Sequence, residues 1–121
     1  MEPFIKNMEH ATVIPLAESV AYETGKVVSI TLAQRPGVGM TLFAFDAGES
    51  VSTHAAPGDA MANILEGQCQ ITIDGTEHQL TGGQSIIMPA GIPHAVKAIT
   101  PFKMLTFEIV ASSAMIPANN P

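Results

Sequence analysis

Glycine and proline interrupt this chain so often that a long helix has no room to form. Its 121 residues include 10 glycines and 9 prolines. Proline lacks the amide hydrogen that a helix interior needs, and glycine loses the most backbone freedom when it is ordered. Short strands joined by turns are the alternative. Hydrophobic residues make up 46% of the chain, which is enough for a domain of this length to bury its own core.

The segments between these interruptions have the patterns of strands. Residues 68–74 alternate most cleanly, with Cys69, Ile71 and Ile73 on one face. The Asp74-Gly75 pair that follows is the strongest hairpin signal in the chain. We therefore predict an all-β fold, an antiparallel sandwich or barrel of eight or nine strands. The expected strands are 26–33, 38–46, 50–55, 60–65, 68–74, 77–80, 84–88, 94–99 and 102–110.

This division predicts one domain at residues 26–110, preceded by an arm at 1–25 and followed by a tail at 111–121. The strand expected at 38–46 is apolar on both faces. One face carries Val38, Met40, Leu42 and Ala44, and the other carries Thr41, Phe43 and Phe45. We expect such a strand to be buried on both sides or to lie at a contact between subunits.

Charge and cysteine content exclude several classes of function. The chain has 5 basic and 11 acidic residues, a net charge of −6, and no basic cluster. Nucleic-acid binding is therefore not expected, because a phosphate backbone requires a basic patch. No apolar stretch is long enough for a membrane span, and no signal peptide is recognisable. The single cysteine, Cys69, cannot form an internal disulfide, and we predict a buried structural thiol and a cytoplasmic protein.

Two segments carry glycine, proline and histidine at characteristic spacings. Residues 48–67 read GESVSTHAAPGDAMANILEG, and residues 83–98 read GQSIIMPAGIPHAVKA. Together they resemble the two signature motifs of the cupin superfamily, G-x5-H-x-H-x3,4-E-x6-G and G-x5-P-x-G-x2-H-x3-N. The matching residues are Gly48, His54, Gly67, Gly83, Pro89, Gly91 and His94. This resemblance implies a jelly-roll-like antiparallel double-sheet β-barrel of the small bacterial cupin type, with a pocket between its sheets. Such domains commonly form homodimers.

Metal-binding cupins use two histidines and a glutamate of the first motif and the histidine of the second. Here Ala56 and Ala60 stand at the second histidine and the glutamate position. The resemblance therefore leaves His54 and His94 as ligands in a degenerate metal site. If a divalent metal is bound, Fe, Mn, Ni and Zn are the candidates.

Asp59, one residue before the glutamate position, admits two interpretations. If the loop cancels the one-residue offset, its carboxylate joins the two histidines in a set that suits Fe(II). Alternatively, it belongs to the Pro57-Gly58-Asp59 turn and bonds backbone amides. Glu108, in the last expected strand, is predicted to be a solvated carboxylate.

Small or flexible side chains at inward positions predict a roomy, dry pocket. We expect it to be lined by Met40, Ala56, Ala60, Ala62, Met88 and Met104. The first functional hypothesis is a protein that binds a small organic ligand in this pocket. The second is a metal-dependent dioxygenase or isomerase that uses His54 and His94, with Asp59 or water completing the shell. The third is a non-catalytic dimeric module with a regulatory or structural role.

Overall fold

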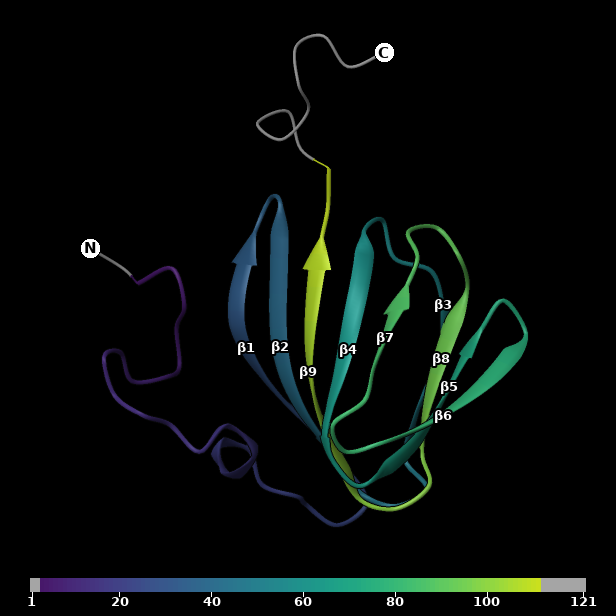
Figure 1. The fold of residues 1–121 in the computed structure, drawn as a ribbon, viewed down its shortest axis with the longest axis horizontal. Coiled ribbons are helices and arrows are strands. Elements are labelled where there is room, and N and C mark those ends of the chain that lie inside the picture. The colour runs from purple at the N-terminus through teal and green to yellow at the C-terminus, as the bar shows by residue number, and fades with distance from the viewer. Residues whose placement is uncertain (1–2, 112–121) are drawn as a thin grey trace, which may run out of the picture.

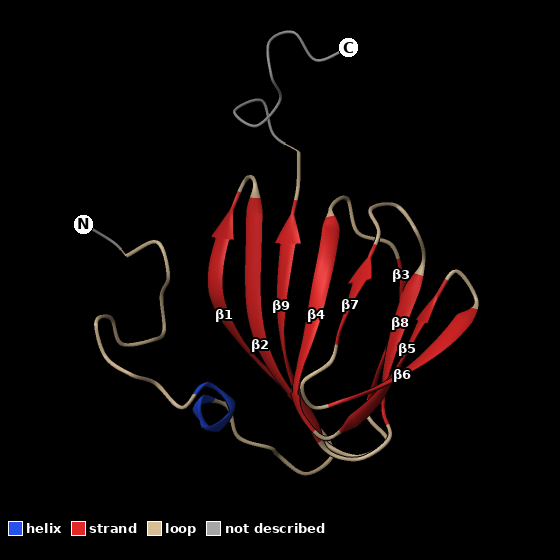
Figure 2. Ribbon diagram, viewed as in Figure 1, coloured by secondary structure: helices blue, strands red, loops and turns tan. Residues whose placement is uncertain are grey.

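The computed structural model describes residues 3–111, and its regular secondary structure is almost entirely β-strand (Figures 1 and 2). A short 3-10 helix, Leu16–Ser19, precedes nine strands. Their bounds are β1 Val27–Arg35, β2 Val38–Phe45, β3 Ser50–His54, β4 Asp59–Glu66, β5 Gln68–Ile73, β6 Thr76–Thr81, β7 Ser85–Met88, β8 His94–Ala98 and β9 Phe102–Ile109. The predicted all-β class is confirmed, and each strand begins and ends within two residues of its expected bounds. Of the predicted tail at 111–121, only the first residue belongs to the described part of the chain.

The strands form two antiparallel sheets that face each other (Figure 1). One sheet has five strands in the order β1-β2-β9-β4-β7, and the other has four in the order β3-β8-β5-β6. The chain passes repeatedly between the sheets, so residues distant in sequence become neighbours across the space between them. This is the double-sheet arrangement that the two motifs predicted.

Two turns show why glycine is needed at particular positions. Asp74 and Gly75 both have positive φ, 49° and 81°, as the tight β5–β6 hairpin requires. Gly67, between β4 and β5, also has a positive φ of 82°. A Cβ at Gly67 would overlap the carbonyl oxygen of Pro101, whereas one at Gly75 would meet nothing within 4 Å. Gly67 is therefore required for close packing as well as for its backbone conformation.

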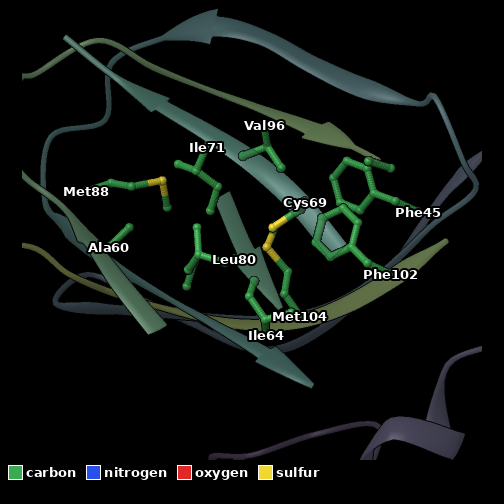
Figure 3. Packing of buried hydrophobic residues seen from close by; sticks show 12 residues of the cluster. Phe45, Ala60, Ile64, Cys69, Ile71, Leu80, Met88, Val96, Phe102 and Met104 are labelled. Carbon is green, nitrogen blue, oxygen red and sulfur yellow. The ribbon is translucent and has the colours of Figure 1, made fainter. Parts of the chain in front are cut away.

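The main hydrophobic core fills the space between the sheets (Figure 3). Phe45 and Phe102 stack at one end with ring centroids 4.6 Å apart, and Met88 and Ala60 lie at the other end. Cys69 is fully buried in this core. Burial raises the pKa of its thiol to about 11, because the thiolate would lose its hydration. The predicted structural role of Cys69 fits this environment.

The outer face of β2 is covered by the chain's own N-terminal arm. Leu42 and Ala44 point to this face and pack in a second cluster that includes Val20, with Met8 and Leu16 at its edge. Strand β2 is thus buried on both sides within one chain, which is one of the two arrangements that its apolar pattern predicted.

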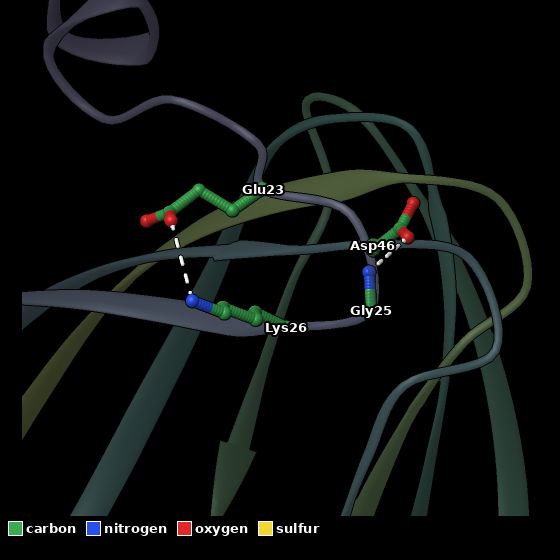
Figure 4. Close-up of polar contacts among 4 residues, drawn as sticks. All are labelled: Glu23, Gly25, Lys26 and Asp46. Carbon is green, nitrogen blue, oxygen red and sulfur yellow. Dashed lines mark hydrogen bonds and ion pairs between the residues drawn. The ribbon is translucent and has the colours of Figure 1, made fainter.

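Polar contacts attach the arm to the sheet. The Lys103 Nζ donates to the Ala17 carbonyl at 2.6 Å, and the Tyr22 hydroxyl donates to Glu66 at 2.7 Å. Where the arm enters β1, the Gly25 amide donates to Asp46 at 2.7 Å, and Lys26 pairs with Glu23 at 3.7 Å (Figure 4). No helix among the described residues has the length and apolar character to cross a membrane.

Candidate functional site

A cavity of about 280 Å³ lies between the two sheets. Its walls come from strands of both sheets and from the loop after β3. The lining residues are Thr41, Phe43, Phe45, Val51, His54, Ala56, Ala60, Met88, His94, Val96, Met104, Thr106 and Glu108. Most of these side chains are apolar, and the polar ones are hydroxyls, imidazoles and one carboxylate.

Strand alternation determines which side chains reach the cavity. On β9, Met104, Thr106 and Glu108 point into the cavity. Lys103, on the same strand, points to the other face of the sheet, where it contacts the N-terminal arm. The residues of β2 alternate in the same way, so Phe43 and Phe45 face the cavity, whereas Met40, which was expected in the pocket, lies on the other face of this strand. The part of the cavity wall that β9 contributes therefore changes along the strand, from the apolar Met104 through Thr106 to the acidic Glu108.

His54 and His94 lie at one end of this cavity. His54 ends β3 and His94 begins β8, and the two residues are register partners. The loop after β3 and the loop after β7 meet here, because the Gly91 amide donates to the Ala56 carbonyl at 2.8 Å. Strand β9 ends at the same end of the molecule, at the top of Figure 1. His94 is buried and His54 is exposed, so the two rings lie at the mouth.

The backbone determines the tautomer of both rings. The Nδ1 of His54 lies 3.0 Å from the Ser52 carbonyl, and that of His94 lies 3.3 Å from the Ile92 carbonyl. A carbonyl oxygen only accepts hydrogen bonds, so each Nδ1 carries the hydrogen and donates it. In the neutral imidazole, Nε2 is then an acceptor. Each ring therefore leaves one acceptor nitrogen to meet a ligand.

The environment of His94 favours its neutral form. Burial lowers the pKa of His94 because it strips water from the imidazolium, and the nearby His54 lowers this pKa further. The bond to the Ile92 carbonyl and the Glu108 carboxylate oppose this shift, but the net direction is downward. The site thus contains a buried imidazole that resists protonation.

The Asp59 carboxylate is hydrogen-bonded to a loop outside its own turn. Its carboxylate accepts a hydrogen bond from the Ala90 amide at 2.8 Å, and the residue is exposed at the start of β4. This contact ties the β3–β4 loop to the β7–β8 loop. Asp59 thus bonds a backbone amide, although the amide belongs to a distant loop rather than to the Pro57-Gly58-Asp59 turn.

The other residues expected in the pocket divide into two groups. Ala56, Ala60, Met88 and Met104 line the cavity together with the two histidines. Ala62 is fully buried in the core. Met40 points to the opposite face of β2, where it lines a separate cavity of about 460 Å³ beneath the arm.

Glu108 is a cavity residue, although the sequence predicted a solvated carboxylate. It is half-buried, lines the cavity, and lies close enough to His94 to influence its pKa. Its register partner on β4 is Ala60, the position at which the resemblance expects a glutamate. The signal was present in the alternation, because an inward Met104 places Thr106 and Glu108 on the same face.

The donor groups at the cavity mouth are too few for a divalent transition metal. Such ions take three or four protein ligands in catalytic and structural sites. Among residues 3–111, no three histidine, cysteine, aspartate or glutamate side chains converge to hold one ion. The two imidazoles therefore do not by themselves fit the group that the family implies.

Comparison with known proteins agrees with the fold and the motifs. The cupin domain family model matches residues 41–108. A conserved protein of unknown function from Streptococcus pyogenes is 42% identical, with 93% of this chain and 98% of that chain covered and a TM-score of 0.90. A cupin superfamily protein from Desulfitobacterium hafniense is 34% identical, with 88% and 98% covered and a TM-score of 0.84.

A cupin 2 conserved barrel domain protein from Leptotrichia buccalis is 41% identical, with a TM-score of 0.78. The alignment covers 79% of this chain and 47% of that longer chain. No curated protein matches the sequence. The family model spans more than half of the residues and the related structures align over most of the chain, so this protein belongs to the cupin domain family.

Proposed function

We propose that this protein binds a small, largely apolar organic molecule in the cavity between its sheets. The observation that carries the proposal is the cavity itself, about 280 Å³ with walls of phenylalanine, valine and methionine and a polar mouth. Ligand sites are typically concave and apolar, with a few polar groups that orient the ligand. Alanines at positions 56 and 60 leave this space open.

The volume limits the size of the ligand. An apolar cavity of about 150 Å³ accommodates benzene. The larger cavity here admits one aromatic ring with a short substituent. Flexible methionine side chains at positions 88 and 104 allow the walls to adapt to such a molecule.

Binding can be tested with one-ring compounds that carry neutral, cationic or anionic substituents, observed by saturation-transfer NMR. We expect at least one compound to bind the wild type, and Ala60→Leu and Ala56→Leu to weaken its binding by filling the cavity. Ala95→Leu, the same change on the surface of β8 outside the cavity, is the control. The proposal fails if no compound binds, or if the cavity-filling variants bind as well as the control.

A metal-dependent dioxygenase or isomerase is the second candidate. The observation that favours it is the pair of Nδ1–carbonyl hydrogen bonds, because histidine ligands are commonly oriented in this way. Elemental analysis of protein purified without added metal tests it. Stoichiometric metal that is lost in His54→Ala would support this candidate, whereas metal-free protein that still binds an organic compound would exclude it.

A non-catalytic dimeric module is a third candidate, supported by exposed apolar side chains. Met61, Ile87 and Ile109 lie on the outer face of neighbouring strands and are 40%, 55% and 50% exposed. A second copy of the chain covering this face would bury them. Light scattering after gel filtration should then show a dimer that Ile87→Lys dissociates, and a monomer at every concentration would rule the module out.

A further inference from the structure

The chemistry of the cavity mouth specifies the charge of the ligand. Resting on the proposed binding cavity, we propose that the ligand is a small aromatic amine in its ammonium form. The ring lies between the apolar walls, and the ammonium group lies at the mouth against Glu108 and the two imidazoles.

The distribution of charged side chains is the first support. Among residues 3–111, no lysine or arginine lines the cavity, and Glu108 is its one acidic residue. All five lysine and arginine side chains of the protein lie outside the cavity. Lys103 bonds the arm, Arg35 stacks on Phe4, Lys26 pairs with Glu23, Lys97 lies on the outer surface of β8, and Lys6 lies in the arm.

This distribution disfavours an organic acid. A carboxylate in the cavity would meet Glu108 without any lysine or arginine to balance it. Burying such an unpaired anion is unfavourable, and a like charge nearby increases the penalty. An ammonium group in the same place gains a counter-ion, and the net charge of −6 attracts cations to the protein as a whole.

The hydrogen-bonding groups at the mouth are the second support. His54 and His94 each have Nδ1 committed to a backbone carbonyl, so each offers Nε2 as an acceptor. Glu108 adds carboxylate oxygens, which also accept. A mouth of acceptors complements a group that only donates, and a primary ammonium has three N–H donors and no acceptor.

The apolar walls suit the rest of the molecule. Phe43 and Phe45 both line the cavity, with ring centroids 5.9 Å apart. Aromatic faces attract cations through the ring quadrupole and also pack against an aromatic ligand. Val51 and Val96 contribute from the opposite sheet, so a ring can be enclosed between the two sheets.

Geometry favours an ammonium group over a metal ion at this place. A transition metal draws its ligands to within about 2.0–2.2 Å of one point, and no three donor side chains in the described residues converge in this way. An ammonium group reaches its acceptors through hydrogen bonds of about 2.7–3.2 Å in different directions. It therefore accepts a more open arrangement of two imidazoles and one carboxylate.

The test compares three molecules of nearly equal shape, namely benzylamine, benzyl alcohol and benzoate, by isothermal titration calorimetry at neutral pH. We expect benzylamine to bind at least tenfold more tightly than benzyl alcohol, because charge-assisted hydrogen bonds are about twice as strong as neutral ones. Benzoate should bind most weakly. Glu108→Gln should remove most of the advantage of benzylamine over benzyl alcohol.

Glu77→Gln is the matched control, since it removes an exposed carboxylate on β6 that does not line the cavity. The inference is overturned if benzyl alcohol or benzoate binds as tightly as benzylamine, or if Glu108→Gln behaves like Glu77→Gln. In both cases the proposed cavity binding would stand. If none of the three molecules binds the wild type, the amine inference is overturned, and binding of other one-ring compounds decides the broader proposal.

Discussion

His54 and His94 face each other across the β3–β8 pair, with ring centroids 4.4 Å apart and ring planes at 64°. Each Nδ1 bonds the carbonyl of the residue two positions earlier in the chain. The two rings therefore share a tautomer and an orienting mechanism, although one is buried and the other exposed. A site built in this way holds two acceptor nitrogens in place before any ligand arrives, which reduces the entropy lost on binding.

The lowered pKa of His94 predicts the pH dependence of stability. Its ordinary value is 6.5 and its pKa in the folded protein is lower. Between these two values the unfolded chain binds more protons than the folded one, so the free energy of unfolding falls as the pH falls below 6.5. Urea unfolding at a series of pH values should show a shallower fall for His94→Gln than for the wild type. His78→Gln, the same change on β6 outside the cavity, is the matched control.

Cys69 should be unreactive in the folded protein. Its thiol is fully buried and its pKa is raised to about 11, so the thiolate is scarce at pH 8. We expect almost no modification by Ellman's reagent in buffer and one equivalent in denaturing urea. Rapid modification of the native protein would show that the core opens around β5.

Gly67 and Gly75 should differ in their tolerance of alanine. Both have positive φ, which costs a non-glycine residue about 1–2 kcal/mol. At Gly75 this strain is the whole penalty, because an added Cβ meets nothing within 4 Å. At Gly67 the added Cβ also overlaps the Pro101 backbone, so Gly67→Ala should lose clearly more stability. Chemical denaturation of the two variants measures the difference, and equal losses would contradict it.

Lys103 should hold the N-terminal arm on the sheet. Its Nζ donates to the Ala17 carbonyl and lies 4.8 Å from the centre of the Tyr22 ring. Lys103→Met keeps the apolar stem and leaves the carbonyl without this donor, for an expected loss of about 1–3 kcal/mol. Hydrogen exchange should accelerate around residues 16–20 more than in the β5–β6 hairpin. Tyr22→Phe, which removes only the bond to Glu66, should have a smaller effect.

Much of the fold was predictable because its signals are local. Alternating residues and turn pairs such as Asp74-Gly75 depend on neighbours in sequence, and all nine strands were located from them. The two histidines were identified from motif spacing, which reflects a shared fold. The interpretation of Asp59 stayed open because a one-residue offset reverses the direction of a side chain, and only the loop contact with Ala90 shows what its carboxylate bonds.

The sequence alone determined the strands, the turns and the two histidines, because each is encoded in a short stretch of chain. Only the tertiary structure decided which side chains share the cavity. Glu108 and His94 line the same cavity because their strands, β9 and β8, belong to the two sheets that face each other, whereas Met40 lies on the opposite face of β2, beneath the arm. The side chain of an apolar or acidic residue in a strand can point to either face of the sheet. Which face lines the cavity depends on how distant segments of the chain pack against the sheet.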